Sequence, residues 1–358
     1  MWHARVAMVM RKLQQHNEAM KEIELAIEMD TEGWHLLMIK AKILASQEKW
    51  QEAIGAMNLS IQLLEGDPAR MKKHIDDYWE NKLFVAEWYY DLEQYDQALE
   101  SYRSCLEHDP DDYDLLPPML EIWLKKDDSS GAMRFIRELN EAKVAKSGHS
   151  RLAHAVIALR DEASFHFDIF QTARQNQELE LIQATYNQAL SIATSKNRRG
   201  QVAWMQYYLG ILFERYLSQR DDAINIWEKT ISDSAKAVKG TGLFNARNEV
   251  VRDLCNLYIE KVSQLEKDSP VAAKYIEKVK DIGTPDTSIL WQYDTASILG
   301  VLYRLLGEDE QAKKCFRSRV KACFDLLTDK DPTVGAADRN ILERVITDLS
   351  QFPEFQLT

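Results

Sequence analysis

One pattern recurs along the first part of this chain: a small residue, a bulky residue four positions later, and a further apolar or small residue three positions after that. The triplets are Ala19, Ile23, Ala26; Ala53, Met57, Ser60; Ala98, Tyr102, Cys105; and Ala132, Ile136, Leu139. The first two lead alanines lie 34 residues apart, as do the last two, whereas the middle interval is 45. Spacings of four and three share one helix face, so each triplet predicts a helix that packs closely at its alanine.

A period of 34 residues indicates a helical-repeat solenoid, in which stacked helix pairs bury a continuous core and each repeat contacts its neighbours. The longer middle interval predicts an insertion in the polar stretch 66–76. Asp67-Pro68 and Asp109-Pro110 are predicted to end the second helices of their repeats. Only 13 glycines and 8 prolines occur in 358 residues, which favours helices with short connections over a β-rich fold.

The pattern resembles the tetratricopeptide (TPR) repeat family, whose first helix carries W-x2-L-G-x2-Y and whose second carries A-x3-F-x2-A followed by Pro. Two later segments carry much of that motif: Trp204, Leu209, Gly210, Phe213, Ala223 and Trp227 in one, and Leu299, Gly300, Tyr303, Ala312 and Phe316 in the other. The chain departs from the family at Thr31 and Glu65 in the Pro position, at Leu120 in place of a small residue, and at Ala223, which comes one residue late. The resemblance implies an all-α superhelix of paired helices.

We expect two regions. Residues 1–140 are predicted to hold four TPR-like repeats, and residues 141–358 to hold degenerate and further repeats with a C-terminal capping helix at about 333–350. The TPR pattern of the second region is strongest at 201–233 and 288–322. Weaker helical pairs are predicted at 151–172 with 178–194, and at 246–264 with 270–282.

The negative charge lies almost wholly in the first region. The net charge of the chain is −12; residues 1–140 hold 27 acidic and 16 basic side chains, and the rest of the chain holds 30 and 29. This excess would repel a phosphate backbone, so we expect neither nucleic acid nor an anionic membrane surface as a partner. A basic or mixed-charge protein partner remains open, as does a charge that serves only solubility. Four cysteines without a C-x-x-C pair, and no secretory signal, predict a cytoplasmic or nuclear protein.

No catalytic motif emerges from the sequence. It contains no G-x-x-x-x-G-K-[ST], no G-x-S-x-G and no H-E-x-x-H. His149, His154 and His166 are the nearest approach to a histidine cluster, but their spacing does not place them on one helix face as metal ligands. The paired aspartates fall at turns and helix starts, where they cap free N–H groups. We therefore expect no enzyme, no cofactor and no metal.

The family resemblance implies that the first helix of each pair lines a concave face that holds a partner. The family register places these residues there: His35, Met38, Ile39, Lys42, Leu83, Phe84, Glu87, Tyr90, Asp91, Glu121 and Lys125. Mixed apolar and acidic groups suit an extended or helical protein segment with apolar anchors and basic flanks.

Some TPR domains clamp a chaperone C-terminal carboxylate, but the matching positions carry no cationic or amide donor, so no such clamp is predicted. Those positions are Ala4, Met8, Ile39, Glu80 and Phe84.

Three functions stay open at this point. The first is a protein-interaction scaffold or adaptor. The second is a sensor or regulatory arm of a larger signalling ATPase-type protein, because Met1-Trp2 already lies in the first predicted helix without a cap, and the irregular repeats resemble the TPR-rich arms of fungal NACHT-type (STAND) receptors. The third is an enzyme with an unrecognised site, which would need a polar pocket with perturbed titratable groups.

Overall fold

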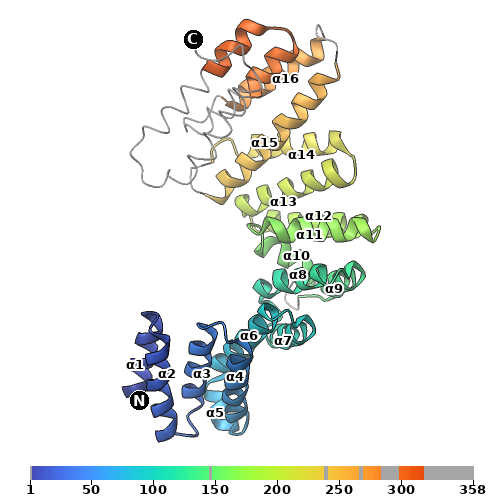
Figure 1. Cartoon of the computed structure of the whole chain (residues 1–358). Coiled ribbons are helices and arrows are strands. Elements are labelled where there is room, and N and C mark those ends of the chain that lie inside the picture. Colours follow the sequence, from blue (N-terminus) through green and yellow to red (C-terminus); the bar gives the residue numbers. More distant parts are fainter. Residues whose placement is uncertain (1, 145–146, 238–240, 266–268, 284–297, 318–358) are drawn as a thin grey trace. The chain divides into compact units, whose positions relative to one another are not determined.

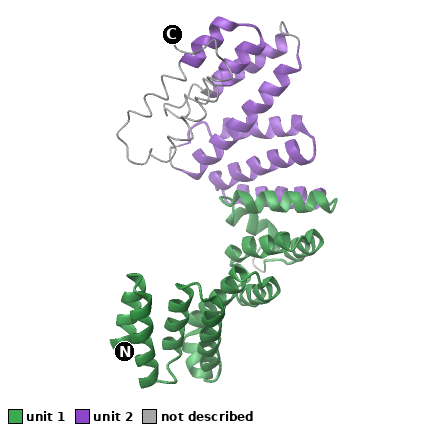
Figure 2. Ribbon diagram, in the orientation of Figure 1, with its two compact units in different colours: residues 1–178 green, residues 179–358 purple. Residues whose placement is uncertain are grey.

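The computed structural model describes residues 2–144, 147–237, 241–265, 269–283 and 298–317 (Figure 1). The chain divides into two compact units, residues 1–178 and 179–358 (Figure 2), which we describe separately. The described residues of both units are built from helices, as the sequence predicts for an all-α repeat solenoid. The predicted capping helix at 333–350 and Cys323 lie outside the described residues.

Unit 1 is a succession of antiparallel helix pairs. Its helices are α1 (Trp2–Lys12), α2 (His16–Met29), α3 (Trp34–Ala45), α4 (Trp50–Glu65), α5 (Pro68–Lys73), α6 (Ile75–Asp91), α7 (Tyr95–His108), the 3-10 turn η1 (Tyr113–Leu115), α8 (Leu116–Lys125), α9 (Ser129–Glu141), α10 (Arg151–Ala158) and α11 (Ala163–Gln175). The pairs are α1 with α2, α3 with α4, α6 with α7, and α8 with α9. Stacking continues from pair to pair, with α2 against α3 and α4 against α6.

The lead alanines of the sequence pattern lie where the paired helices cross. Ala19, Ala53, Ala98 and Ala132 are completely buried. The small residues of the first helices, Ala7, Ala41 and Ala86, are completely buried as well, and Leu120 takes that place in the fourth pair. A methyl group on each side lets two helix backbones approach closely, and the bulky residue one turn on fills the groove beside the crossing.

The first helix of each pair ends in the same way. Gln14, Glu48, Glu93 and Asp127 have φ of 62°, 59°, 57° and 54°, and each lies seven residues after the crossing position of its helix, which is Ala7, Ala41, Ala86 or Leu120. The next N–H then bonds to the carbonyl five residues back, as from Lys49 to Leu44 at 3.1 Å. This left-handed turn satisfies carbonyls at the helix end and reverses the chain for the second helix. The turn is therefore a property of the repeat rather than of one loop.

Two segments of unit 1 differ from the expectation. The polar stretch 66–76 contains a short helix, α5, because Asp67 accepts hydrogen bonds from the N–H groups of Ala69 and Arg70 at 3.1 and 3.0 Å and Pro68 starts the helix. The segment 151–172, expected as one helix of a pair, is broken into α10 and α11. The turn between them is held by a 2.9 Å hydrogen bond from His166 Nε2 to the carbonyl of Leu159. Neither Gly nor Pro marks this break, so hydrophobic periodicity alone did not reveal it.

Unit 2 contains α12 (Leu179–Ser195), α13 (Arg199–Ile211), the π-helix η2 (Leu212–Tyr216), α14 (Arg220–Asp233), α15 (Gly242–Ser263) and α16 (Pro270–Gly283). Residues 298–305 and 309–317 are also helical. Helix α13 is central, because it packs against α12, α14 and α15. The π-helix explains why Ala223 comes late: a π turn takes up one extra residue, so Ala223 follows Gly210 by thirteen residues, whereas Ala312 follows Gly300 by twelve.

Candidate partner-binding face

Helices α3 and α6 meet through side chains that the sequence assigned to the partner site. The ammonium of Lys42 lies 3.3 Å from a carboxylate oxygen of Glu80 and 4.4 Å from the ring centroid of Phe84. Phe84 in turn stacks on Trp88, with ring centroids 5.8 Å apart. The lysine is therefore held by both an ion pair and a cation–π contact, and the first helices of the second and third pairs are neighbours on this face.

Helices α6 and α8 meet in the same way. The Tyr90 hydroxyl donates to Glu121 Oε1 at 2.6 Å and accepts from Lys125 Nζ at 2.6 Å. Lys125 also lies 3.2 Å from Glu121 and 4.4 Å from the centroid of the Tyr90 ring. The hydrogen bond from Tyr90 lowers the pKa of Glu121, and the bond to Tyr90, followed by that to Glu121, raises the pKa of Lys125. Both groups are thus held in their charged forms at neutral pH.

We call these exposed and half-buried side chains of α3, α6 and α8 the first-helix face. It comprises His35, Met38, Lys42, Leu83, Phe84, Glu87, Tyr90, Asp91, Glu121 and Lys125. Along each helix most of these residues recur at spacings of three, four or seven positions, and the others are next to one of them in sequence. They therefore form a stripe along one side of the helix. His35 is half-buried with its ring 5.9 Å from that of Trp34, and burial lowers the pKa of His35.

One predicted residue does not belong to this face. Ile39 is only 6% exposed and lies in the core cluster that α3 forms with the first helix pair, beside Ala7 and Ile23. Its neighbour Met38 is half-buried and packs against both this cluster and the next one. The assignment of Ile39 to a partner surface is therefore wrong, because the stacking of α3 on α1 and α2 covers that side of the helix.

Three carboxylates, on α6 and α11, form no ion pair among the described residues, although the charge of Lys125 acts on Asp91 from a distance. Glu87 and Asp91 lie one turn apart on α6, and Asp168 lies on α11; within the described ranges none of them forms an ion pair or a hydrogen bond. Partial burial, and then the charge of Asp91, raises the pKa of Glu87. Partial burial also raises the pKa of Asp91, and burial followed by the charge of Glu121 raises that of Asp168. The ionised forms of these carboxylates are therefore destabilised, and a cation bound nearby would reduce this unfavourable free energy.

Glu80 and Asp168 were absent from the site predicted by sequence. Glu80 lies one turn before Phe84 on α6, so the four-residue spacing was enough to place it on the same stripe. No comparable signal existed for Asp168, since the repeat register is lost after residue 150 and only the structure shows α11 packed beside α8. The sequence therefore placed residues of α3, α6 and α8 on this face and gave no indication of Asp168 on α11.

The described parts of the chain contain no group of three or more His, Cys, Asp or Glu side chains that could hold a metal ion. Among the described helices, none has the length and apolar character needed to cross a membrane. Cys105, Cys255 and Cys315 are free thiols, and burial raises the pKa of Cys105 to about 11, so this thiol stays protonated and unreactive at neutral pH.

Comparison with known proteins gives one family match. The family model of the tetratricopeptide repeat matches residues 85–112, which run from α6 through α7. No curated protein matches the sequence. Among solved structures, the chain is similar to YrrB, described as a TPR protein with an unusual peptide-binding site, at 14% identity, covering 63% of this chain and 97% of that one, with a TM-score of 0.34.

Two further solved structures are similar at the same low level. The apo form of the quorum sensor NprR from B. thuringiensis is 11% identical, with 90% and 86% of the two chains covered and a TM-score of 0.34. The TPR domain of P58(IPK) is 12% identical, with 97% and 98% covered and a TM-score of 0.28. TM-scores at this level carry no argument about what this chain binds. The family match shows one tetratricopeptide repeat at residues 85–112, and the other helix pairs of unit 1 repeat its arrangement with the same left-handed turn between their helices.

Proposed function

We propose that this protein is an interaction scaffold, and that its first-helix face binds an extended or helical segment of a partner protein that carries basic side chains beside apolar anchors. The observation that carries the proposal is the pair of unpaired carboxylates Glu87 and Asp91 on α6, with a further unpaired carboxylate, Asp168, on α11. Acidic groups without internal partners favour a basic ligand, both by steering its approach and by pairing with it after contact.

The lysines of the face do not oppose this reading. Lys42 is compensated by Glu80, and Lys125 by Glu121, so neither presents an uncompensated positive charge. Half-buried Met38, Leu83 and Phe84 supply apolar surface next to the carboxylates. Apolar and aromatic side chains flanked by charge are the usual composition of an anchoring site for a peptide segment.

The same chemistry disfavours a partner that is recognised through a C-terminal carboxylate. A carboxylate clamp needs converging cationic or amide donors. Here Glu80 is anionic, Phe84 has no donor, and the ammonium of Lys42 is already bound between them. We therefore expect internal basic segments, rather than acidic chain ends, to occupy the first-helix face.

The test is selection of random 12-residue peptides on the full chain, followed by fluorescence-anisotropy affinities for the selected peptides. We expect enrichment of Lys and Arg beside Leu, Met or aromatic residues. Glu87→Gln with Asp91→Asn should weaken binding roughly tenfold at low salt and less at high salt, and Phe84→Ala should weaken it at both.

The matched controls lie on α4: Glu52→Gln removes an exposed carboxylate and Leu59→Ala an exposed leucine, and both should leave affinity unchanged. Selection of acidic peptides, or equal losses in the α4 controls, would show that the first-helix face is not the binding site.

A further inference from the structure

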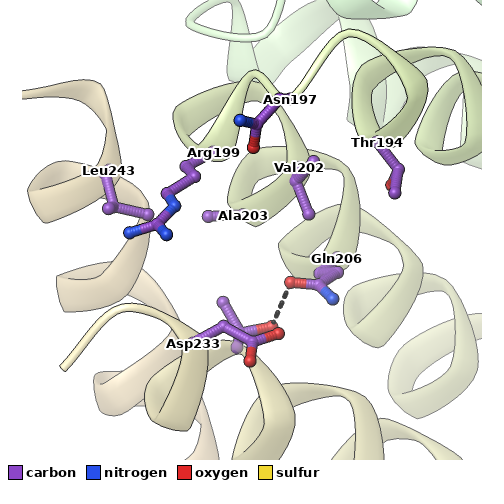
Figure 3. Close-up of a pocket in the computed structure, with 9 residues that line it drawn as sticks. Thr194, Asn197, Arg199, Val202, Ala203, Gln206, Asp233 and Leu243 are labelled. Carbon is purple, nitrogen blue, oxygen red and sulfur yellow. Dashed lines mark hydrogen bonds between the residues drawn. The ribbon is translucent and has the colours of Figure 1, made fainter.

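Unit 2 contains a pocket of about 230 Å³ at a place where four helices begin or end (Figure 3). Helices α12 and α14 end beside it, at Ser195 and Asp233, and α13 and α15 begin beside it, at Arg199 and Gly242. The N-terminal end of a helix carries partial positive charge and the C-terminal end partial negative charge. The pocket is therefore bordered by helix ends of both signs.

Side chains of the same two signs line this pocket. Arg199 is the first residue of α13 and Asp233 the last residue of α14, and they lie on different sides of the pocket (Figure 3). Both are exposed, and neither forms an ion pair or a hydrogen bond with any residue in the described ranges. Because the two side chains share one small pocket and do not pair with each other, each can bind a ligand group of the opposite charge.

The remaining wall supplies apolar surface and one polar side chain, that of Gln206. Val202, Ala203 and Leu243 contribute aliphatic surface. Gln206 is only 4% exposed; its side-chain oxygen accepts from Thr230 Oγ1 at 3.0 Å, while its amide nitrogen makes no hydrogen bond within the described part of the chain. That nitrogen is not sealed from solvent, so it is available to donate a hydrogen bond to a ligand oxygen.

The wall is formed by close backbone packing. A Cβ atom at Gly200 would lie 3.3 Å from the backbone nitrogen of Leu243, so α13 and α15 approach closely at their first turns. Thr241 caps α15 by accepting from the Phe244 N–H at 3.3 Å, which fixes the helix start beside the pocket. The pocket thus belongs to the packed helices.

We infer that this pocket binds an α-amino-acid zwitterion, either as a free amino acid or as a dipeptide. The carboxylate pairs with Arg199 near the helix N-termini, the ammonium pairs with Asp233 near the end of α14, and an aliphatic side chain covers Val202, Ala203 and Leu243. The volume is below the roughly 300–1,000 Å³ of drug-sized sites, which suits one or two residues. This site is separate from the first-helix face and does not depend on the proposed function.

The experiment is isothermal titration calorimetry of the full chain with four probes: L-leucine, L-leucyl-L-leucine, N-acetyl-L-leucine, which lacks the ammonium, and L-leucinamide, which lacks the carboxylate. We expect L-leucine or the dipeptide to bind with a Kd of about 1 mM or tighter, and each blocked derivative to bind at least about tenfold more weakly. Tighter binding of the dipeptide than of L-leucine would identify the dipeptide as the ligand class, and the reverse would identify the free amino acid.

Two variants assign the two charges. Arg199→Gln should weaken binding of the zwitterion at least about tenfold and leave the affinity for L-leucinamide unchanged. Asp233→Asn should weaken binding of the zwitterion to the same extent and leave the affinity for N-acetyl-L-leucine unchanged. Arg198→Gln and Asp222→Asn, which alter exposed charges outside the pocket, are the controls and should bind as the parent does. The inference is overturned if none of the four probes binds below about 10 mM, if blocked and unblocked probes bind equally, or if the pocket variants match the controls.

Discussion

Gly210 on α13 lies directly against the indole of Trp227 on α14: a Cβ atom at position 210 would be 2.0 Å from Nε1 and 2.2 Å from Cε2 of that ring. Trp227 is completely buried, and its Nε1 donates to the carbonyl of Tyr207 at 3.2 Å. The indole therefore occupies the space that a side chain at position 210 would need, and its hydrogen bond keeps it there. Both positions belong to one of the two segments whose sequence resembles the TPR motif.

Gly210→Ala is expected to destabilise the protein by about 3 kcal/mol or more, because the buried indole has no free direction in which to move. The control is Gly55→Ala on α4, where a Cβ would meet nothing within 4 Å; this change should stabilise by about 0.5–1 kcal/mol. Urea unfolding followed by circular dichroism measures both. If the clash is the cause, the cost of Gly210→Ala shrinks in a Trp227→Leu background, and an unchanged cost there would contradict this explanation.

The left-handed turns predict a second pair of opposite effects. Glu48 has φ of 59° and carries a side chain that is unfavourable in this region, so Glu48→Gly should stabilise or leave stability unchanged, by about 0–1 kcal/mol. Gly307 occupies the same turn position with φ of 77°, and Gly307→Ala should destabilise by about 1 kcal/mol. Thermal unfolding of the two variants checks this, and a loss of stability in Glu48→Gly would argue against a strained turn.

His166 predicts a pH dependence of stability. Its ring is completely buried, and this desolvation lowers the pKa to about 3 from an ordinary value of 6.5. The neutral ring thus contributes stability that is fully present above pH 6.5 and is lost as the pH falls toward 3, by at most about 1.4 kcal/mol per pH unit. Urea midpoints measured from pH 7 to pH 4 should fall less steeply in His166→Gln. Titration of the His166 ring near pH 6.5 by NMR would refute the assignment.

Glu87 predicts that stability and binding change in opposite directions. Burial and Asp91 raise its pKa in the folded chain, so the stability linked to its protonated form is present below its ordinary pKa and is lost as the pH rises through the raised value. Glu87→Gln removes that loss: the free protein should be more stable at pH 7 and unchanged at low pH, while affinity for basic peptides falls. Parallel thermal melts at the two pH values and anisotropy titrations measure the effects. A variant that is less stable at pH 7 would contradict the burial argument.

The placement of most residues of the first-helix face could be predicted from sequence. Lys42 contacts Phe84, and Tyr90 contacts Glu121 and Lys125. The sequence placed these residues on one stripe of each helix, because residues four apart on one helix point the same way whatever the helix packs against. Ile39 was misassigned because its stripe is covered by the preceding pair, which periodicity within α3 does not reveal. Asp168 was missed because the break between α10 and α11 shifts the register.

The sequence by itself determined the helix pairs, the alanines and glycines at their crossings and the position of the turns, since each depends on residues within one or two helical turns of each other. Only the tertiary structure decided that Leu212–Tyr216 forms a π-helix, that residues 151–172 divide at Leu159, and that four helix ends enclose a pocket between Arg199 and Asp233. Those features arise where one helix pair is fitted onto the next, and that packing energy depends on side chains far apart in the chain.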